Sequence, residues 1–407
     1  MRHKWNSLIK REGITIMKLF RHSLLVFLLI MACLCPGCAA KDKTSIRNVL
    51  KTDLDRLKSM DSDLAGEYLQ NASLFPDTDP EGAASEEIKD VFSLYFKDFS
   101  YKIGSINVQG DDAAASVTIT TPDSRAIARD YASEELELEI KGASASSDAS
   151  LSSGQKSDPR LLLNHILKTG AYEIVKSDIS IPLTREGEAW SVKKSSALEN
   201  DLTGGLVTAL HDPEILSPSD TLEIYLSAIK TMDTDTLERF LGIQALSDEK
   251  AVSNETASDE PDSDESGSVE TDTRSLIAKA LTEQVQQHFS YEIKDEKRDG
   301  YRAEVSADIT SFDSSAILSA YQEAADAYLA SADALIDGYD RRREKLRQYL
   351  LKAITENTAA ATAAQVFHFT NDGLSWKPDD PETEFGTALL VDFASSGEEL
   401  LSQDEEE

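Results

Sequence analysis

Three cysteines are the residues best suited to covalent chemistry in this chain, and all of them lie near its N-terminus. They are Cys33, Cys35 and Cys38, and no other residue of the 407 is cysteine. A basic stretch with Lys18 and Arg21 precedes the apolar run 24–30, which is too short to span a bilayer as a helix. We therefore expect residues 1–37 to be a targeting leader. The folded chain is expected to hold no disulfide and no cysteine-based metal site.

Pro36, Gly37 and Cys38 end the apolar run in a way that resembles a bacterial lipoprotein signal, in which a small residue precedes the cysteine that receives lipid. The resemblance implies that Cys38 is the lipidated N-terminus of an extracytoplasmic protein, anchored to the outer face of the cell membrane. Cys33 follows Ala32 and also fits the pattern, so it is the alternative lipidation site. A cleaved secretory peptide without lipid is a second alternative. The membrane, reached through this lipid, is thus one expected partner.

Polar and charged sequence precedes this leader in residues 1–16. Arg11, Glu12 and Gly13 can be encoded by a purine run that resembles a ribosome-binding site. We therefore predict that translation starts at Met17.

Motifs for enzyme catalysis are missing from the sequence, which contains no glycine-rich phosphate loop, no Gly-x-Ser-x-Gly elbow and no His-Glu-x-x-His pair. Asp61 and Asp63, like Asp233 and Asp235, suggest calcium, but the residues that follow become apolar too soon to supply six oxygen ligands. Asp63 and Asp235 are instead interpreted as helix caps. We expect no catalytic residue, no metal and no cofactor.

Acidic residues outnumber basic residues by 74 to 41, which gives a formal net charge of −33. A surface with this balance repels phosphate, so we expect no nucleic acid partner. The 40% of hydrophobic residues is sufficient for folded cores.

Aromatic residues that recur at fixed offsets are the candidates for lining a binding pocket. They are Tyr101, Tyr131 and Trp190 in the first half of the chain, and Tyr291, Tyr321 and Trp376 in the second half. Such a pocket would take a small apolar ligand. The second half is favoured because its helix around Tyr321 is expected to be longer and uninterrupted. That helix is expected to run as far as Ile354, with Gly338 as a candidate break. The alternative is that these six side chains fill the core.

The aromatic residues match because the chain contains an internal duplication. Residues 99–131 and 289–321 are identical at 14 of 33 positions without a gap, at an offset of 190. Matching segments lie at an offset of 172 upstream and of 186 downstream. None of the four histidines beyond the leader recurs, which excludes a histidine-based site shared by both copies. We predict two homologous domains, 45–210 and 214–392, followed by an acidic tail, 393–407.

Two segments lack the apolar residues that would order them. The Ser-rich stretch 142–157 is a predicted flexible loop of the first domain, and the acidic stretch 248–274 is a predicted disordered insertion in the second.

Hydrophobic periodicity predicts the same series of elements in each domain. The series begins with a helix, 45–59 or 218–231, and Ser217 followed by proline is a start signal for the second of these. Two shorter helices and a hairpin follow. A further helix, capped by Asp123 or Asp313, leads to a final hairpin that carries the tryptophan.

This order, with a tryptophan on the last strand and a closing segment rich in leucine and glycine (202–206), resembles the cystatin-like, nuclear transport factor 2-like fold. Tandem copies behind a lipid signal resemble lipoproteins of Gram-positive bacteria. The resemblance implies an α+β fold with helices on a curved antiparallel sheet in each domain. We expect a non-enzymatic module that binds a small apolar ligand or a cell-envelope protein. The alternatives are an isomerase- or hydratase-like enzyme with a pocket in one domain, and a structural or immunity-like surface protein.

Overall fold

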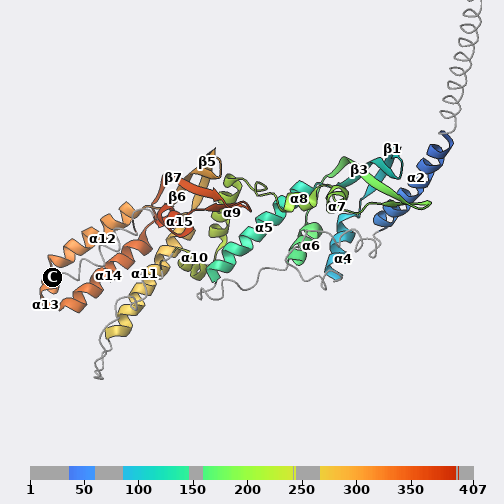
Figure 1. Cartoon of the computed structure of the whole chain (residues 1–407). Coiled ribbons are helices and arrows are strands. Elements are labelled where there is room, and N and C mark those ends of the chain that lie inside the picture. Colours follow the sequence, from blue (N-terminus) through green and yellow to red (C-terminus); the bar gives the residue numbers. More distant parts are fainter. Residues whose placement is uncertain are drawn as a thin grey trace, which may run out of the picture. The chain divides into compact units, whose positions relative to one another are not determined.

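The computed structural model describes residues 36–59, 86–145, 159–241, 243, 266–390 and 393. They form helices and two separate four-stranded antiparallel sheets, which is an α+β architecture (Figure 1). The chain divides into two compact units. Unit 1 takes its described residues from the ranges 1–127 and 163–208, and unit 2 takes them from 128–162 and 209–407.

Unit 1 is built on the first sheet, whose strand order follows the chain, β1-β2-β3-β4. Its strands are β1 (Ser100–Gln109), β2 (Asp112–Pro122), β3 (Ile174–Glu186) and β4 (Ala189–Val192). Its helices are α2 (Pro36–Lys58), α4 (Glu86–Tyr95), α6 (Pro159–Thr169) and α7 (Ser196–Leu202), with the first four residues of α6 beyond the unit boundary. Burial alternates along β2, so one face of the sheet covers the core.

Unit 2 repeats this plan on the second sheet, in the order β5-β6-β7-β8. Its strands are β5 (Ser290–Asp299), β6 (Arg302–Phe312), β7 (Ala360–Asn371) and β8 (Trp376–Pro378). Its helices are α9 (Pro218–Thr231), α10 (Thr234–Phe240), α11 (Ser266–His288), α12 (Ser314–Leu329), α13 (Ala332–Ile336), α14 (Tyr339–Glu356) and α15 (Pro381–Leu390). Like α6, the helices α5 (Ser124–Ala145) and α8 (Leu206–Leu210) cross a unit boundary.

The strand register of the two sheets is the same, as the duplication requires. Tyr101 pairs with Ile119 across the first hairpin, and Tyr291 pairs with Ile309 across its counterpart. A register shift follows at the same place in β1 and in β5. The internal repeat read from the sequence is therefore a repeat of structure.

The predicted start of α9 is confirmed. Ser217 Oγ accepts a hydrogen bond from the Asp220 backbone N–H over 3.0 Å, and Asp220 Oδ2 accepts one from the Ser217 N–H over 2.9 Å. The cap of α10 differs from the prediction, because Asp233 and not Asp235 holds that position. An N-cap needs extended backbone, which Asp233 has, whereas Asp235 already lies in the first turn. The equivalent Asp63 lies outside the described residues.

The first helix of unit 1 is longer than its hydrophobic stripe predicted. Periodicity placed the start at residue 45, whereas α2 begins at Pro36, nine residues earlier. The added segment includes Ala39 and Ala40, which favour helix but contribute little to an apolar stripe. The helix therefore contains Cys38 in its first turn. Of the predicted leader, only residues 36 and 37 are described.

The long helix expected in unit 2 is a helical hairpin. The candidate break at Gly338 is present, but a second break at Ser331 means that the helix is not otherwise uninterrupted. Ser331 caps α13 and Gly338 precedes α14, so two breaks lie close together. The rings of Tyr328 and Tyr349 are 5.8 Å apart, and α12 and α14 lie side by side with α13 at their shared end (Figure 1). The Tyr328 hydroxyl donates to Asp337 over 2.9 Å, which closes the bend.

The acidic insertion predicted at 248–274 overlaps a helix, because α11 begins at Ser266. The side chain of Thr273 is 6% exposed, and its hydroxyl donates to Glu344 Oε1 over 2.7 Å. Residues 266–274 therefore form part of a packed helix. The first four residues of the predicted loop 142–157 lie in α5. The rest of both segments, like the tail after Phe393, lies outside the described residues.

Helix α5 belongs mostly to unit 2, although the predicted boundary placed all of it in the first domain. From Ala128 onward it groups with unit 2. The side chain of Ile140 is 4% exposed and forms part of that core, against which Leu136 packs. Arg129 also forms an ion pair with Asp220 on α9. Apolar contact thus assigns α5 from Ala128 onward to unit 2.

Candidate functional site

The two tryptophans that were expected to line a pocket are buried, and each donates its indole N–H to a carboxylate. Trp190 on β4 is 5% exposed, and Trp376 on β8 is 2% exposed. Their acceptors are Asp42 in α2 and Glu214 just before α9. Asp42 and Glu214 are related by the offset of 172 found in the sequence. The duplication has therefore kept the same contact in both units.

In unit 1, Asp42 joins Trp190 to an arginine. Trp190 Nε1 donates to Asp42 Oδ1 over 3.4 Å, and Arg185 Nη2 forms an ion pair with Asp42 Oδ2 at 2.5 Å. The central guanidinium carbon of Arg185 lies 4.6 Å from the centroid of the Trp190 ring, within range of a cation–π contact. The side chains of Asp42 and Arg185 are only 21% and 26% exposed. The pair is therefore shielded from water.

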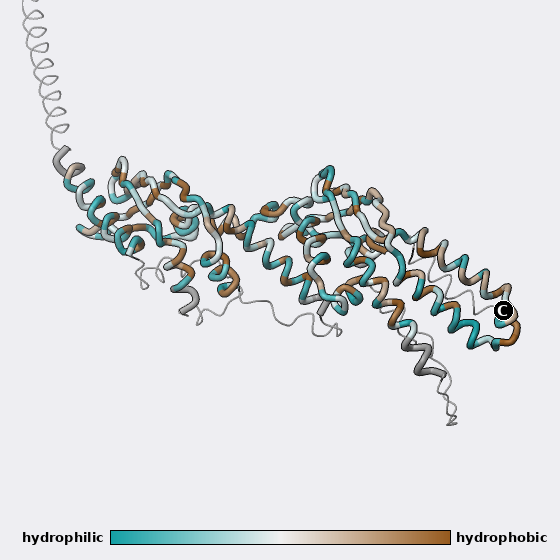
Figure 2. The backbone as a smooth tube through the Cα atoms, turned by 180° about the vertical axis from the view of Figure 1, so that it is seen from behind, coloured by the Kyte–Doolittle hydropathy of each residue, from teal (hydrophilic) through white to brown (hydrophobic). Residues whose placement is uncertain are grey.

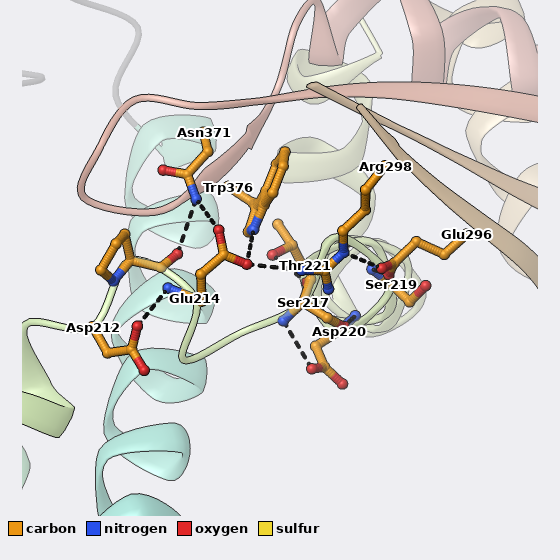
Figure 3. A network of polar contacts seen from close by, with 11 residues as sticks. Asp212, Glu214, Ser217, Ser219, Asp220, Thr221, Glu296, Arg298, Asn371 and Trp376 are labelled. Carbon is orange, nitrogen blue, oxygen red and sulfur yellow. Dashed lines mark hydrogen bonds and ion pairs between the residues drawn. The ribbon is translucent and has the colours of Figure 1, made fainter. Parts of the chain in front are cut away.

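In unit 2, Glu214 holds a larger set of partners (Figure 3). Its Oε2 accepts from Trp376 Nε1 over 3.1 Å and from Arg298 Nη1 over 2.7 Å, and its Oε1 accepts from Asn371 Nδ2 over 2.9 Å. Arg298 lies 5.5 Å from the centroid of the Trp376 ring. Glu214 and Arg298 are 47% and 40% exposed, so this cluster is closer to water than its counterpart.

Arg298 also pairs with a second acid, which links the cluster to the start of α9. Its Nε donates to Glu296 Oε1 over 2.5 Å, and the Ser219 backbone N–H donates to Glu296 Oε2 over 2.9 Å (Figure 3). Partial burial opposes ionisation of Glu296. The hydrogen bonds from Ser219 and Arg298 outweigh it and hold the pKa of that carboxyl below its usual range.

The arginines of the two clusters are not equivalent residues. Arg185 lies on β3, where unit 2 has Asn371, and Arg298 lies on β5, where unit 1 has Val108. Each unit therefore places a guanidinium beside its tryptophan from a different strand. We call these residues the tryptophan clusters, Asp42–Arg185–Trp190 in unit 1 and Glu214–Arg298–Trp376 in unit 2.

Both oxygens of Asp42 accept hydrogen bonds within its cluster, whereas in unit 2 the cluster partners donate to Glu214 Oε2 and Asn371 donates to Oε1. The contacts connect the N-terminal part of α2, or the segment before α9, to the last strand of the sheet. Charge-assisted hydrogen bonds of this kind stabilise a fold by about 2 kcal/mol when partly buried. The chemistry of the clusters is thus structural.

The candidate tyrosines on β1 and β5 lie at the other end of the first helix of each unit. The Tyr101 hydroxyl donates to Asp55 Oδ1 over 2.6 Å. Burial, with this acceptor, raises the pKa of Tyr101 to about 12. In unit 2, burial and the nearby Glu223 raise the pKa of Tyr291, and a hydrogen bond with Ser227 lowers it. Asp55 and Ser227 are equivalent at the offset of 172.

The six candidate residues therefore do not form one site in either unit. In unit 1, Trp190 contacts Asp42 and Tyr101 contacts Asp55, thirteen residues and about 20 Å further along the same helix. Tyr131 belongs to unit 2 on α5, with its hydroxyl 3.4 Å from Glu135 of the same helix. Tyr321 packs, partly buried, against the core of unit 2.

One buried acid was not identified from the sequence. Glu199 on α7 is 2% exposed, and neither of its carboxyl oxygens has a hydrogen-bond partner among the described residues. Burial raises the pKa of Glu199 to about 7. Its equivalent at the offset of 186 is Phe385, which is fully buried in unit 2. That mismatch between an acid and a core aromatic residue was the available signal.

The neighbourhood of Glu199 is polar where unit 2 is apolar. The Tyr95 hydroxyl lies 2.7 Å from Ser124 Oγ and donates to the backbone oxygen of Thr203 over 2.5 Å, one helical turn beyond Glu199. Burial raises the pKa of Tyr95 to about 12. The equivalent of Tyr95 at the offset of 190 is Val285, which is 0% exposed. Unit 1 thus buries two ionisable side chains, Glu199 and Tyr95, at positions where unit 2 has Phe385 and Val285.

Comparison with known proteins gives one similar structure. No family model matches the chain, and no curated protein matches it. Among solved structures, the chain is similar to the candidate lipoprotein YcdA of Bacillus subtilis, with 12% sequence identity. The similarity covers 72% of this chain and 94% of that chain at a TM-score of 0.25. At that score it supports no assignment, and the assignments below depend on the residues themselves.

The described residues contain no group of three or more His, Cys, Asp or Glu side chains placed to hold a metal ion. Within the same residues, no helix combines the length and the hydropathy needed to cross a membrane.

Proposed function

We propose that the protein is a lipid-anchored extracytoplasmic binding module without enzyme activity, made of two cystatin-like units. The observation that carries the proposal is the position of Cys38 in the first turn of α2, four residues before Asp42. Asp42 is held by Arg185 and Trp190 of the sheet. A lipid on Cys38 would therefore be joined to unit 1 through a helix that is itself tied to the core.

This arrangement suits a module that holds a binding surface at a set distance from a membrane. A tether of free chain would let the unit move over a wide volume, whereas a short helix restrains it. The tryptophan clusters support the same view, because their acids and indoles are engaged within each unit. Binding would then use the outer surfaces of the units, and the partner would be a cell-envelope protein or a small apolar ligand.

The anchor is tested by changing each candidate cysteine in cells that process lipoproteins. Cys38→Ala is expected to release the protein into the medium or leave it unprocessed. Cys33→Ala is the matched control and should remain lipidated in the membrane fraction. Normal lipidation of Cys38→Ala together with loss of lipid from Cys33→Ala would move the anchor to Cys33. Membrane retention without lipid in both variants would contradict the proposal.

Glu199 favours a second candidate function, an isomerase- or hydratase-like activity in unit 1. A buried carboxyl whose pKa is raised to about 7 can exchange a proton with a bound substrate near neutral pH. The experiment is to follow deuterium exchange into a panel of enolisable ketones in heavy water by NMR. Exchange that is lost in Glu199→Gln, with folding retained, would support this activity. No exchange above the buffer rate across the panel would count against it.

A further inference from the structure

The bend of the helical hairpin in unit 2 exposes large apolar side chains. They are Leu329 (49% exposed), Leu335 (88%), Ile336 (81%) and Tyr339 (50%). They lie at the end of α12, in α13 and at the start of α14, where the hairpin turns back (Figure 1). In Figure 2 the same bend is hydrophobic, whereas α14, which follows it, is largely hydrophilic. We call these four residues the apolar tip.

Basic residues follow the apolar tip directly. Arg341 and Arg342 are exposed on the first turn of α14, and the guanidinium of Arg343 lies 5.8 Å from the centroid of the Tyr339 ring. Residues 329–345 contain four bases and four acids, so their net charge is zero in a chain whose net charge is −33. The bend is thus far less acidic than the protein as a whole.

One of those acids is neutralised within the bend. Asp337 forms an ion pair with Lys345 at 3.1 Å and accepts a hydrogen bond from the Tyr328 hydroxyl over 2.9 Å. Hydrogen bonds from Lys345 and Tyr328 hold the pKa of Asp337 below its usual range, so it stays ionised and paired. The charge of Arg341 also lowers the pKa of Asp337, and the side chains of Arg341 and Arg342 themselves remain exposed.

The order of residue types in the bend matches the layers of a membrane surface. Leu335 and Ile336 stand at the turn, Tyr339 follows three residues later, and Arg341 and Arg342 come after the exposed Asp340. Aliphatic side chains suit the acyl region, tyrosine suits the interface, and arginine suits anionic headgroups. A protein partner would need none of this layering.

We propose that the apolar tip inserts into an anionic lipid surface and that Arg341 and Arg342 bind the lipid phosphates. The protein would then contact a membrane at a second place, through unit 2, which carries no lipid. A lipid chain with a second, basic contact holds a protein far more firmly than one chain alone. The contact does not depend on Cys38, so it can be tested separately from the anchor.

The helix homologous to α12 is α5, which from Ala128 onward belongs to unit 2. In α5, Leu136 and Ile140 pack against the core of unit 2. The equivalent positions in α12, at the offset of 190, are Asp326 and Ala330, both exposed. The apolar tip lies outside that contact, and the hairpin bend that carries it has no counterpart among the described residues of unit 1.

The test places a tryptophan at the tip of the full chain and compares it with a matched exposed site. Leu335→Trp is the test variant, and Leu374→Trp is the control, because Leu374 is 78% exposed in the turn between β7 and β8. The fluorescence of each variant is compared with that of the parent chain, so that the signal of the native tryptophans can be subtracted. The probes are vesicles of phosphatidylglycerol with brominated acyl chains, and phosphatidylcholine vesicles of the same kind.

Leu335→Trp should shift to the blue and lose most of its fluorescence with phosphatidylglycerol, whereas Leu374→Trp should not respond. Arg341→Glu and Arg342→Glu should each weaken vesicle binding by at least about fivefold. Equal quenching at the two sites, or none at residue 335, would overturn the proposal. A tip tryptophan already shifted to the blue without vesicles would also overturn it, and would indicate that a second copy covers the tip.

Discussion

The same structural position holds an acid in unit 1 and an aromatic ring in unit 2. Glu199 is buried with no hydrogen-bond partner among the described residues, whereas Phe385 stacks on Tyr225 with ring centroids 5.3 Å apart. The ring centroid of Phe367 lies 5.0 Å from that of Phe385. The two units keep the same backbone at this position, but the chemistry of the buried side chain differs. The difference teaches that the same backbone position accommodates a buried ionisable group in unit 1 and a buried aromatic ring in unit 2.

The largest expected effect comes from moving the acid into unit 2. Phe385→Glu should destabilise unit 2 by about 4 kcal/mol or more, because it replaces a fully buried ring with a carboxylate. Hydrogen exchange of the β6 and β7 peptides measures this loss. Phe385→Leu is the control and should cost roughly 1 kcal/mol. If Phe385→Glu were tolerated, the two positions would not differ in the way described.

A second expected effect is a pH dependence of stability in unit 1, for which unit 2 serves as the reference. The ordinary pKa of a glutamate is 4.5, and burial raises that of Glu199 to about 7. The folded state therefore binds the proton of Glu199 more tightly than the unfolded state does. The contribution of Glu199 to stability is full below about pH 4.5. That contribution falls as the pH rises to about 7, and it is constant above that. The total is about 3 kcal/mol for unit 1.

Hydrogen exchange of the β2 and β3 peptides between pH 4.5 and 8 would measure this dependence, after correction for the intrinsic exchange rate. Glu199→Gln should flatten the profile of unit 1, and the β6 and β7 peptides of unit 2 serve as an internal reference. A profile of unit 1 that keeps its slope in Glu199→Gln would show that another group is responsible.

A third expected effect compares the tryptophan clusters. Asp42→Ala should destabilise unit 1 by about 2 kcal/mol, because the pair of Asp42 and Arg185 is shielded and the buried Trp190 N–H loses its acceptor. Glu214→Ala should cost unit 2 only about 1 kcal/mol, since Glu214 and Arg298 are more exposed. Urea unfolding of each variant checks the order. A larger loss in Glu214→Ala would mean that the number of partners matters more than shielding.

The smallest expected effect is an equal loss of stability when either of two equivalent helix caps is removed. Asp123 accepts from the backbone N–H groups of Arg125 and Ala126 over 3.0 and 3.2 Å, and Asp313 accepts from the equivalent groups at the same distances. Asp123→Ala and Asp313→Ala should therefore each cost about 1 kcal/mol. Thermal melts of the two variants should agree. A clear difference would show that the caps have diverged as the interiors have.

Features encoded in short windows could be predicted from the sequence. The duplication, the hairpins, the capping box at Ser217 and the caps at Asp123 and Asp313 all depend on periodicity or on contacts within a few residues. The α+β architecture follows from them, and the structure agrees. The leader and the lipid on Cys38 remain predictions, because they depend on a resemblance and lie at the edge of the described residues.

The tertiary structure alone decided the features that depend on distant partners. Arg185 lies opposite Trp190 in the register of β3 and β4, whereas Arg298 reaches Trp376 from β5, a strand that does not pair with β8. Glu199 reads as a surface acid of a short helix until the fold buries it. The hairpin bend closes through Tyr328 and Asp337, and the side chain of Ile140 decides which unit includes α5. Local patterns specify elements because their hydrogen bonds are local, whereas burial and ion pairing depend on where those elements meet.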